Sequence, residues 1–226
     1  MNILIFGPNG SGKGSQGALL KKRCDLVHIE SGGIFRDHLS KGTELGKKAK
    51  EYMDHGDLVP DDITIPMVLE SLQQAGANRW LLDGFPRNVA QAEKLWEALA
   101  NANMTLDYVI ELQLPREDAQ KRITGRRICE NDSSHPNNIN NPALLPVNGA
   151  CRICGGALST RPDDQNEASI TKRHEIYYDE KSGTLAAVHF FKKLAEAGQT
   201  AYIMLDSRGD IDEVNGKLLQ QLRIPV

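Results

Sequence analysis

The sequence predicts an α/β protein with a parallel sheet flanked by helices and interrupted by two inserted segments. Short apolar runs of strand length alternate with helical stretches, which is typical of a parallel sheet covered on both faces. The first apolar run leads into a glycine-rich turn and then a helical stretch, in the order that a phosphate-binding loop requires. Two segments, at 31–59 and 128–161, break the alternation and are the expected insertions.

Five apolar runs are the expected strands: Asn2–Phe6, Val27–Glu30, Trp80–Asp83, Tyr108–Leu114 and Thr200–Leu205. The stretches between them predict helices, among them Gln16–Arg23, Ile63–Gln74, Val89–Asn101 and Arg116–Arg126. In a parallel α/β sheet, ligands bind beyond the carboxyl ends of the strands. We therefore expect the motifs that follow these strands to converge on one site.

Composition and charge narrow the class of protein. With 226 residues, 40% of them hydrophobic, the chain can bury one core, and nothing requires more than a monomer. A net charge of −3 argues against a large cationic surface for nucleic acid. No apolar run approaches the roughly eighteen residues of a membrane span, and the first run is too short for a signal peptide. A cytoplasmic globular protein is expected.

The glycine-rich turn reads GPNGSGKGS at 7–15. Its glycines let consecutive backbone N–H groups face a phosphate, and the following helix N-terminus adds its positive dipole end. Lys13 stands where its ammonium can reach the β- and γ-phosphates. The flanking strand and helix argue against a plain surface turn. The residues expected to bind the phosphates of a nucleoside triphosphate are Gly10, Ser11, Gly12, Lys13, Gly14 and Ser15.

A second motif follows the third predicted strand. Asp83 at the strand end can orient Mg²⁺, directly or through its waters. Gly84 and Pro86 form a turn that presents Arg87. Further arginines that can clamp phosphates are Arg36, Arg122, Arg126, Arg127, Arg161 and Arg173. No general base is evident, which fits an acceptor that is itself an ionised phosphate, as in a nucleoside monophosphate.

A cluster of cysteines and one histidine predicts a structural metal site. Cys129, His135, Cys151 and Cys154 match a Cys₃His zinc set, and four protein ligands leave no open position for catalysis. Asp132 is the alternative fourth ligand, and a redox-active Cys-x-x-Cys pair is the alternative to a metal. Cobalt or iron could occupy the same donor set.

The segment around these ligands is too polar to fold by burial. Residues 131–149 are rich in Asn, Pro and Ser, so either the insertion has no fixed structure or a bound metal orders it. Cys24 and the remaining histidines belong to no comparable cluster and are expected to be surface or packing residues.

Taken together, these motifs resemble the adenylate kinase family, in its long form with a metal-bearing lid, over nearly the whole chain. The displaced hydroxyl Ser15, one place later than in most phosphate loops, resembles the same family. The matching segments are 7–15, the Gly-x-Leu-Val of Gly56–Val59, DGFPRN at 83–88 with Gln91, Gly125–Arg127 and Thr160–Asp164. The resemblance implies the nucleoside monophosphate kinase fold. Its core is 1–30, 61–125 and 162–226, its AMP-binding insertion 31–60 and its lid 126–161, both mobile.

The resemblance also implies a reaction and residue roles: Mg²⁺-dependent, reversible transfer from ATP to AMP, giving two ADP. The implied AMP-binding residues are Ser31, Arg36, Asp57, Leu58, Val59, Gly84, Phe85, Pro86, Arg87, Gln91, Arg161 and Arg173. Gln91 would read the adenine edge, Arg126 would cover ATP, and Gly209 would lie near the ATP base. The implied catalytic residues are Lys13, Asp83, Arg87, Arg122, Arg161 and Arg173.

Three departures from the family pattern stand out. Gly33 replaces an aspartate, so the helix that begins there loses a carboxylate cap. One extra residue before Arg173 leaves open whether Lys172 fills its role. The first metal-binding pair of the lid is reduced to Cys129 with a downstream histidine. The alternatives are a kinase for UMP, CMP or GMP, an ATPase with a nucleic-acid-binding zinc ribbon, and a non-catalytic nucleotide-binding protein.

Overall fold

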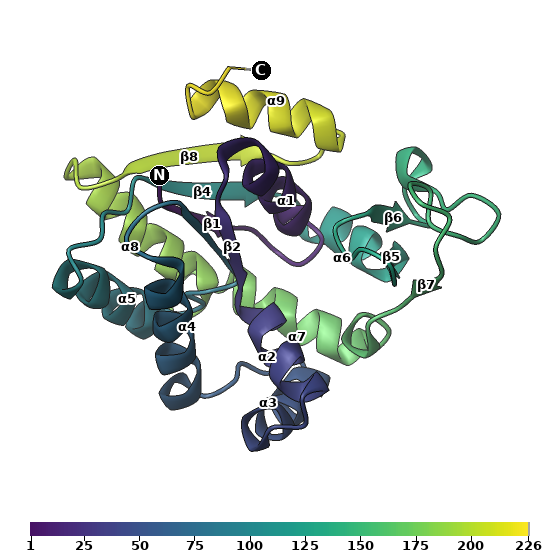
Figure 1. Cartoon of the computed structure of the whole chain (residues 1–226), viewed down its shortest axis with the longest axis horizontal. Helices are drawn as coiled ribbons and strands as arrows, with labels where there is room; N and C mark the ends of the chain where they lie inside the picture. The colour runs from purple at the N-terminus through teal and green to yellow at the C-terminus, as the bar shows by residue number, and fades with distance from the viewer. Residues whose placement is uncertain (226) are drawn as a thin grey trace.

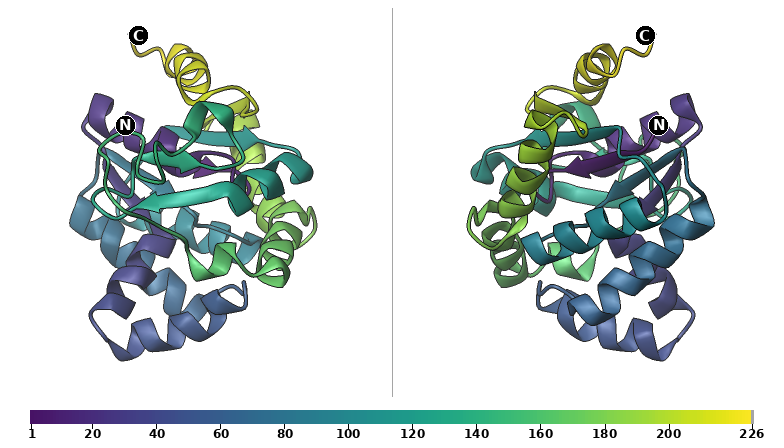
Figure 2. Two further views of the ribbon diagram at one scale, coloured as in Figure 1. Left: turned by 90° about the vertical axis from the view of Figure 1, so that its right-hand side faces the viewer. Right: turned by 90° about the vertical axis from the view of Figure 1, so that its left-hand side faces the viewer.

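The computed structural model describes residues 1–225 and has a parallel sheet at its centre (Figures 1 and 2). The five strands follow the order β2-β3-β1-β4-β8, and every neighbouring pair is parallel. They are β1 (Ile3–Phe6), β2 (Val27–Glu30), β3 (Trp80–Asp83), β4 (Tyr108–Gln113) and β8 (Ala201–Asp206). The five predicted strands are thus confirmed, with ends that differ by one residue at most.

Helices cover both faces of this sheet, which explains why the inner strands β1, β3 and β4 are buried almost throughout, whereas the edge strands β2 and β8 are partly exposed. Leu4 and Phe6 of β1 pack in one core cluster with α4, α5 and α8, whereas Ile3 and Ile5 pack in the other with α1 and α9. The core helices are α1 (Lys13–Cys24), α4 (Asp61–Ala75), α5 (Val89–Asn101), α6 (Arg116–Gly125), α7 (Glu167–Tyr178), α8 (Thr184–Glu196) and α9 (Ile211–Gln221).

The first insertion is helical and extends below the sheet in Figure 1. It contains α2 (Ser31–Ser40) and α3 (Glu44–Asp54). Thr43 caps α3 by accepting a hydrogen bond from the N–H of Gly46, at 3.1 Å. No side chain caps the start of α2, as the glycine at position 33 predicts. The two helices share a small core of Phe35, Ala49, Val59 and Met67.

The second insertion forms a small antiparallel sheet to the right of the core in Figure 1. Its order is β6-β5-β7, from β5 (Arg126–Cys129), β6 (Pro136–Asn138) and β7 (Leu158–Ser159), with short 3₁₀ helices at Pro142–Leu144 and Pro162–Asp164. The alternative of an insertion without structure is therefore wrong.

This small sheet has almost no apolar core. Between positions 126 and 161, the buried residues are Cys129, Asn137, Asn138 and Cys151. Two of them are predicted metal ligands and two are amides, so hydrophobic burial does not account for the fold of this segment.

No helix within residues 1–225 combines the length and the apolar character needed to cross a membrane.

Candidate active site

A cleft of about 980 Å³ opens at the carboxyl ends of the strands, between the core and the two insertions. Every residue predicted to contact nucleotide or to act in catalysis lines it, except Ser11 and Pro86. Ser11 is buried within the glycine-rich turn, and Pro86 lines a small neighbouring pocket. The expected convergence of motifs at this edge of the sheet is confirmed.

At the start of α1, the glycine-rich turn leaves backbone N–H groups available for an anion. Helix α1 begins at Lys13, and its cap residue Gly12 has φ +91° and supplies no side-chain hydrogen bond. The first N–H groups of the helix therefore have no side-chain partner and face the cleft. Gly10 has φ +97°, and a Cβ there would lie 2.6 Å from the carbonyl oxygen of Ala119, so only glycine fits.

Lys13 is held at the mouth of this turn. Its Nζ donates hydrogen bonds to the carbonyl oxygens of Gly7 and Pro8, at 2.6 Å and 3.2 Å. Burial lowers the pKa of Lys13, and the nearby Asp83 carboxylate opposes that shift. A phosphate oxygen can replace these two carbonyls as the acceptor.

Asp83 ends β3, and its carboxylate is almost fully buried. Burial alone would raise its pKa, but the positive charge of Lys13, with His28 and Arg87, outweighs burial and holds the pKa below its usual value. The group is therefore an ionised carboxylate at neutral pH. Such oxygens are the donors that Mg²⁺ prefers, so the residue fits the expected role.

The turn after β3 connects the two halves of the cleft. Gly84 has φ +81°, and its carbonyl oxygen accepts hydrogen bonds from Ser31 Oγ (2.7 Å) and Arg87 Nε (2.8 Å). Gln91 Oε1 accepts from the N–H of Arg87 at 2.7 Å, while its Nε2 donates to Asp61. The amide of Gln91 keeps one lone pair and one N–H, a donor and acceptor pair that the edge of a base can use.

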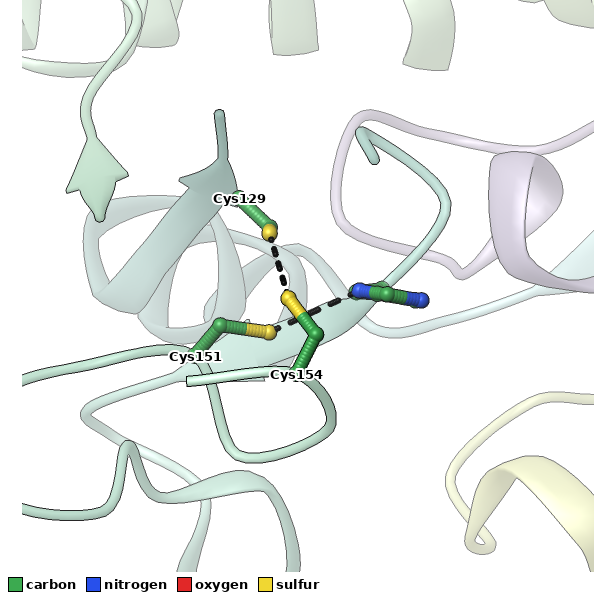
Figure 3. A group of neighbouring side chains, drawn as sticks. Cys129, Cys151 and Cys154 are labelled. Atoms are coloured by element: carbon green, nitrogen blue, oxygen red, sulfur yellow. Dashed lines mark hydrogen bonds between the residues drawn. The ribbon is translucent and has the colours of Figure 1, made fainter. Parts of the chain in front are cut away.

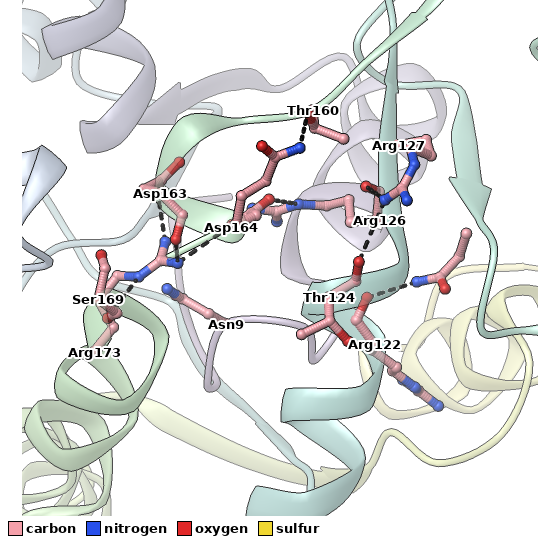
Figure 4. A network of polar contacts seen from close by, with 12 residues as sticks. Asn9, Arg122, Thr124, Arg126, Arg127, Thr160, Asp163, Asp164, Ser169 and Arg173 are labelled. Atoms are coloured by element: carbon pink, nitrogen blue, oxygen red, sulfur yellow. Dashed lines mark hydrogen bonds and ion pairs between the residues drawn. The ribbon is translucent and has the colours of Figure 1, made fainter. Parts of the chain in front are cut away.

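Arginines from the lid boundary gather opposite the glycine-rich turn (Figure 4). Arg126 makes a bidentate ion pair with Asp164, with N–O distances of 2.7 Å and 2.8 Å. Arg173 pairs with Asp163 at 2.6 Å and approaches Asp164 at 3.3 Å. Arg161 makes no ion pair within residues 1–225, and burial, with Arg126 and Arg36, lowers its pKa to about 10. The cleft thus holds a cation without an ion-pair partner, which suits a phosphate.

Arg122 lies elsewhere in the cleft. Its guanidinium donates hydrogen bonds to the carbonyl oxygens of Ser207 and Arg208, at 2.8 Å and 2.9 Å, in the loop that carries Gly209. It braces the β8–α9 loop in this structure, away from the carboxylates that hold Arg126.

The two candidates for the last arginine position are separated by their contacts. Arg173 lines the cleft, whereas Lys172 does not and instead pairs with Asp57 at 2.5 Å. The structure therefore brings Arg173 to the other arginines.

The predicted metal ligands come together in the lid (Figure 3). Cys129 Sγ lies 3.5 Å from Cys154 Sγ, Cys151 Sγ lies 3.7 Å from His135 Nδ1, and all four ligand atoms lie within 4.8 Å of one another. Asp132 is not in this group; its Oδ2 lies 3.6 Å from His135 Nε2. That is the position of a carboxylate that orients a metal-binding histidine. Three thiols and one imidazole fit a tetrahedral metal of the zinc type.

The surroundings of Cys151 favour the thiolate that a metal needs. Desolvation disfavours the charged form, but the N–H groups of Cys154 and Ile153 and the amide of Asn137 outweigh it and lower the pKa of Cys151 to about 6. The Cys-x-x-Cys segment is a turn, whereas a thioredoxin-like redox pair begins a helix after a strand. The local structure therefore favours the metal over the redox alternative.

Comparison with known proteins decides the family. Residues 5–196 match the family model described as adenylate kinase. The chain belongs to the adenylate kinase family. It is 65% identical to the adenylate kinase of Nitratidesulfovibrio vulgaris (strain Miyazaki F) and 62% identical to that of Desulfovibrio desulfuricans. Each match spans 222 residues, 98% of this chain and all of the relative. The adenylate kinase of Lawsonia intracellularis is 57% identical over 224 residues, 99% of this chain and 98% of the relative.

Two residues of the cleft, His28 and Glu30, were missed as site residues by the sequence reasoning. His28 was expected to be a packing or surface residue, and it does pack against Gly17, yet it also lines the cleft. The alternation of side chains along a strand could have found both, because positions 28 and 30 share the face of β2 that Asp83 occupies on β3.

Proposed function

We propose that the protein transfers the terminal phosphoryl group of ATP reversibly to AMP, giving two ADP. The observation that carries this proposal is the shape of the cleft. One cavity contains the glycine-rich turn on one side and, on the other, Arg36, Arg87 and the first insertion. Two phosphate-binding regions that share one cavity suit a transfer between two nucleotides. Membership of the adenylate kinase family supports the same reaction.

The donor nucleotide is assigned to the glycine-rich turn. The free N–H groups at the start of α1 and the ammonium of Lys13 would hold its β- and γ-phosphates, with Arg126 above them. Its base would lie against the loop that carries Gly209, which Arg122 braces. The hydroxyl of Ser15 lies in the same cleft.

The acceptor AMP is assigned to the side of the cleft formed by the first insertion and the turn after β3. Arg36 and Arg87 would hold its phosphate, and the free donor and acceptor of Gln91 would pair with the adenine edge. The backbone around Asp57–Val59 and Gly84–Pro86 would enclose the nucleoside.

The chemistry requires positioning and charge, not a proton acceptor. An ionised phosphate of AMP is already a nucleophile, so in-line transfer needs alignment and neutralisation of the developing charge. Lys13, Arg87, Arg161 and Arg173 would supply that positive charge. Mg²⁺, when bound with ATP, supplies further charge neutralisation, and the ionised carboxylate of Asp83 would orient it.

The lid is proposed to carry a structural metal, for which zinc is the first choice and cobalt or iron also fits. The donor set Cys129, His135, Cys151 and Cys154 and the absence of an apolar core between 126 and 161 support this. We propose that the lid and the first insertion close over bound nucleotides and exclude water. Arg126 and Arg173 would then exchange their carboxylate partners for phosphates.

We further propose that the protein is a cytoplasmic monomer. Its four cysteine thiols are free in the structure, which suits a reducing compartment.

Replacement of Arg87 tests the proposed site. Arg87→Ala is expected to lower kcat by about two orders of magnitude, as for the loss of a group that stabilises transition-state charge. A coupled assay of ADP formation measures it. Arg116→Ala is the matched control, because Arg116 is about half exposed, pairs with Glu175 at 3.8 Å and does not line the cleft. A kcat for Arg87→Ala equal to that of the control would remove Arg87 from the site.

A further inference from the structure

Three side chains of the cleft converge at the ends of β2 and β3. Glu30 lies opposite Asp83 in the register of the two parallel strands, and His28 is two residues earlier on the same face of β2. His28 Nε2 lies 3.9 Å from Asp83 Oδ2 and 4.0 Å from Glu30 Oε1. One ligand atom from each of the three residues lies within 4.8 Å of the other two.

The imidazole of His28 points into this group without a hydrogen-bond partner. Only 8% of its side chain is exposed, and its Nε2 is buried and unpaired within residues 1–225. The ring is fixed against α1, since a Cβ added at Gly17 would lie 2.4 Å from its Cε1. Buried polar atoms are nearly always paired, so an orphaned nitrogen aimed at two carboxylates indicates a missing ligand.

The carboxylate of Glu30 is available for such a ligand. Its side chain packs beside Gly33, where an added Cβ would lie 3.2 Å from Glu30 Cβ. The positive groups near it are Arg36, whose guanidinium lies 3.5 Å from Oε2, together with Lys13 and Arg161. Arg36 contacts Oε2, which leaves Oε1 facing His28.

We propose that His28, Glu30 and Asp83 form a divalent-cation site that binds a metal before nucleotide enters and prefers Mn²⁺ to Mg²⁺. His28 Nε2 lies 4.0 Å from Glu30 Oε1 and 3.9 Å from Asp83 Oδ2, and all three ligand atoms lie within 4.8 Å of one another, so one ion can contact all three. An imidazole nitrogen with two carboxylates is a donor set that favours first-row transition ions, whereas Mg²⁺ prefers oxygen and retains its waters. The site adjoins Lys13, so its consequence for catalysis, though not its existence, rests on the proposed function.

Binding of Mn²⁺ to the nucleotide-free protein tests the proposal. The full chain, with its lid metal in place, is titrated with Mn²⁺ while electron paramagnetic resonance measures the free ion. We expect one ion per chain, with Kd weakened about tenfold or more in Glu30→Gln and in His28→Gln. Glu97→Gln is the control, because Glu97 is exposed on α5 and outside the cleft. Failure to bind Mn²⁺, or equal Kd values in all four proteins, would overturn the proposal.

A spectroscopic measurement guards against loss of fold in a variant. Electron spin-echo modulation from a directly bound imidazole ¹⁴N is expected for Mn²⁺ in the wild type and in Glu97→Gln. Bound Mn²⁺ without this modulation in the wild type would exclude His28 as a ligand. A parallel assay of ADP formation separates the two proposals: an inactive protein that binds Mn²⁺ contradicts the proposed function alone, and an active one that does not bind it contradicts the site alone.

Discussion

Removal of the metal proposed for the lid is expected to lower the thermal stability of the protein. Among residues 126–161, only Cys129, Asn137, Asn138 and Cys151 are buried, so no apolar cluster can replace the metal as a cross-link. The ligands Cys129 and Cys154 enclose a loop of about 25 residues, and chain entropy assigns about 3.5 kcal/mol to closing a loop of that size. For a protein of this length, that corresponds to a fall in Tm of about 7–14 °C.

The assay is differential scanning calorimetry before and after metal removal, with the metal content of each sample measured by mass spectrometry. Cys154→Ser should show the Tm of the metal-free protein without any chelator. Cys154 is exposed, so its replacement removes a ligand and no packing. Cys24→Ser, which leaves all four ligands in place, is the control and should retain the metal. Addition of zinc should restore the original Tm of the metal-stripped wild type. It should leave the Tm of Cys154→Ser unchanged.

An unchanged Tm in protein shown to have lost its metal would contradict a stabilising role of the metal. In that case the hydrogen bonds of Asn137 and Asn138, to Cys151 and Arg122, would have to hold the lid without a cross-link.

Three further predictions concern single side chains. Asp132→Asn should weaken zinc affinity about tenfold, measured by competition with a chromogenic chelator, because Asp132 orients His135; equal affinity would show that it does not. Arg173→Ala should lower kcat by about two orders of magnitude, and Lys172→Ala by less than about tenfold, in the assay of ADP formation. The reverse order would assign the phosphate contact to Lys172. Gln91→Ala should raise KM for AMP about tenfold, the value of one hydrogen bond, with a smaller effect on KM for ATP; equal effects on both would exclude it as an adenine contact.

The sequence was sufficient for the sheet and the glycine-rich turn because both depend on local signals. Buried parallel strands are short apolar runs, and the turn is defined by glycines before a helix. All five strands and the convergence of their ends could therefore be predicted. The lid strands could not: β7 is two residues long, and β5 begins with two arginines, so neither has a readable periodicity.

Contacts between distant segments account for what the sequence could not predict in the site. The ion pair of Arg126 with Asp164 joins residues 38 positions apart, and Arg122 turns toward a loop 85 positions later. The choice between Arg173 and Lys172 depends on where α7 places each side chain, which a single inserted residue leaves open. The meeting of His28 with Asp83 follows from the register of β2 and β3, and register is a property of the folded sheet.

The most direct test of the central claim is ³¹P NMR of the purified protein with Mg·ATP and, in separate samples, AMP, GMP, CMP or UMP. We predict rapid formation of ADP with AMP and much slower turnover with the other three. Turnover with another monophosphate but not with AMP would preserve the fold and the transfer chemistry and overturn Gln91 as the adenine contact. ATP that remains intact with all four acceptors would contradict the proposed phosphoryl transfer itself and leave a nucleotide-binding protein without kinase activity.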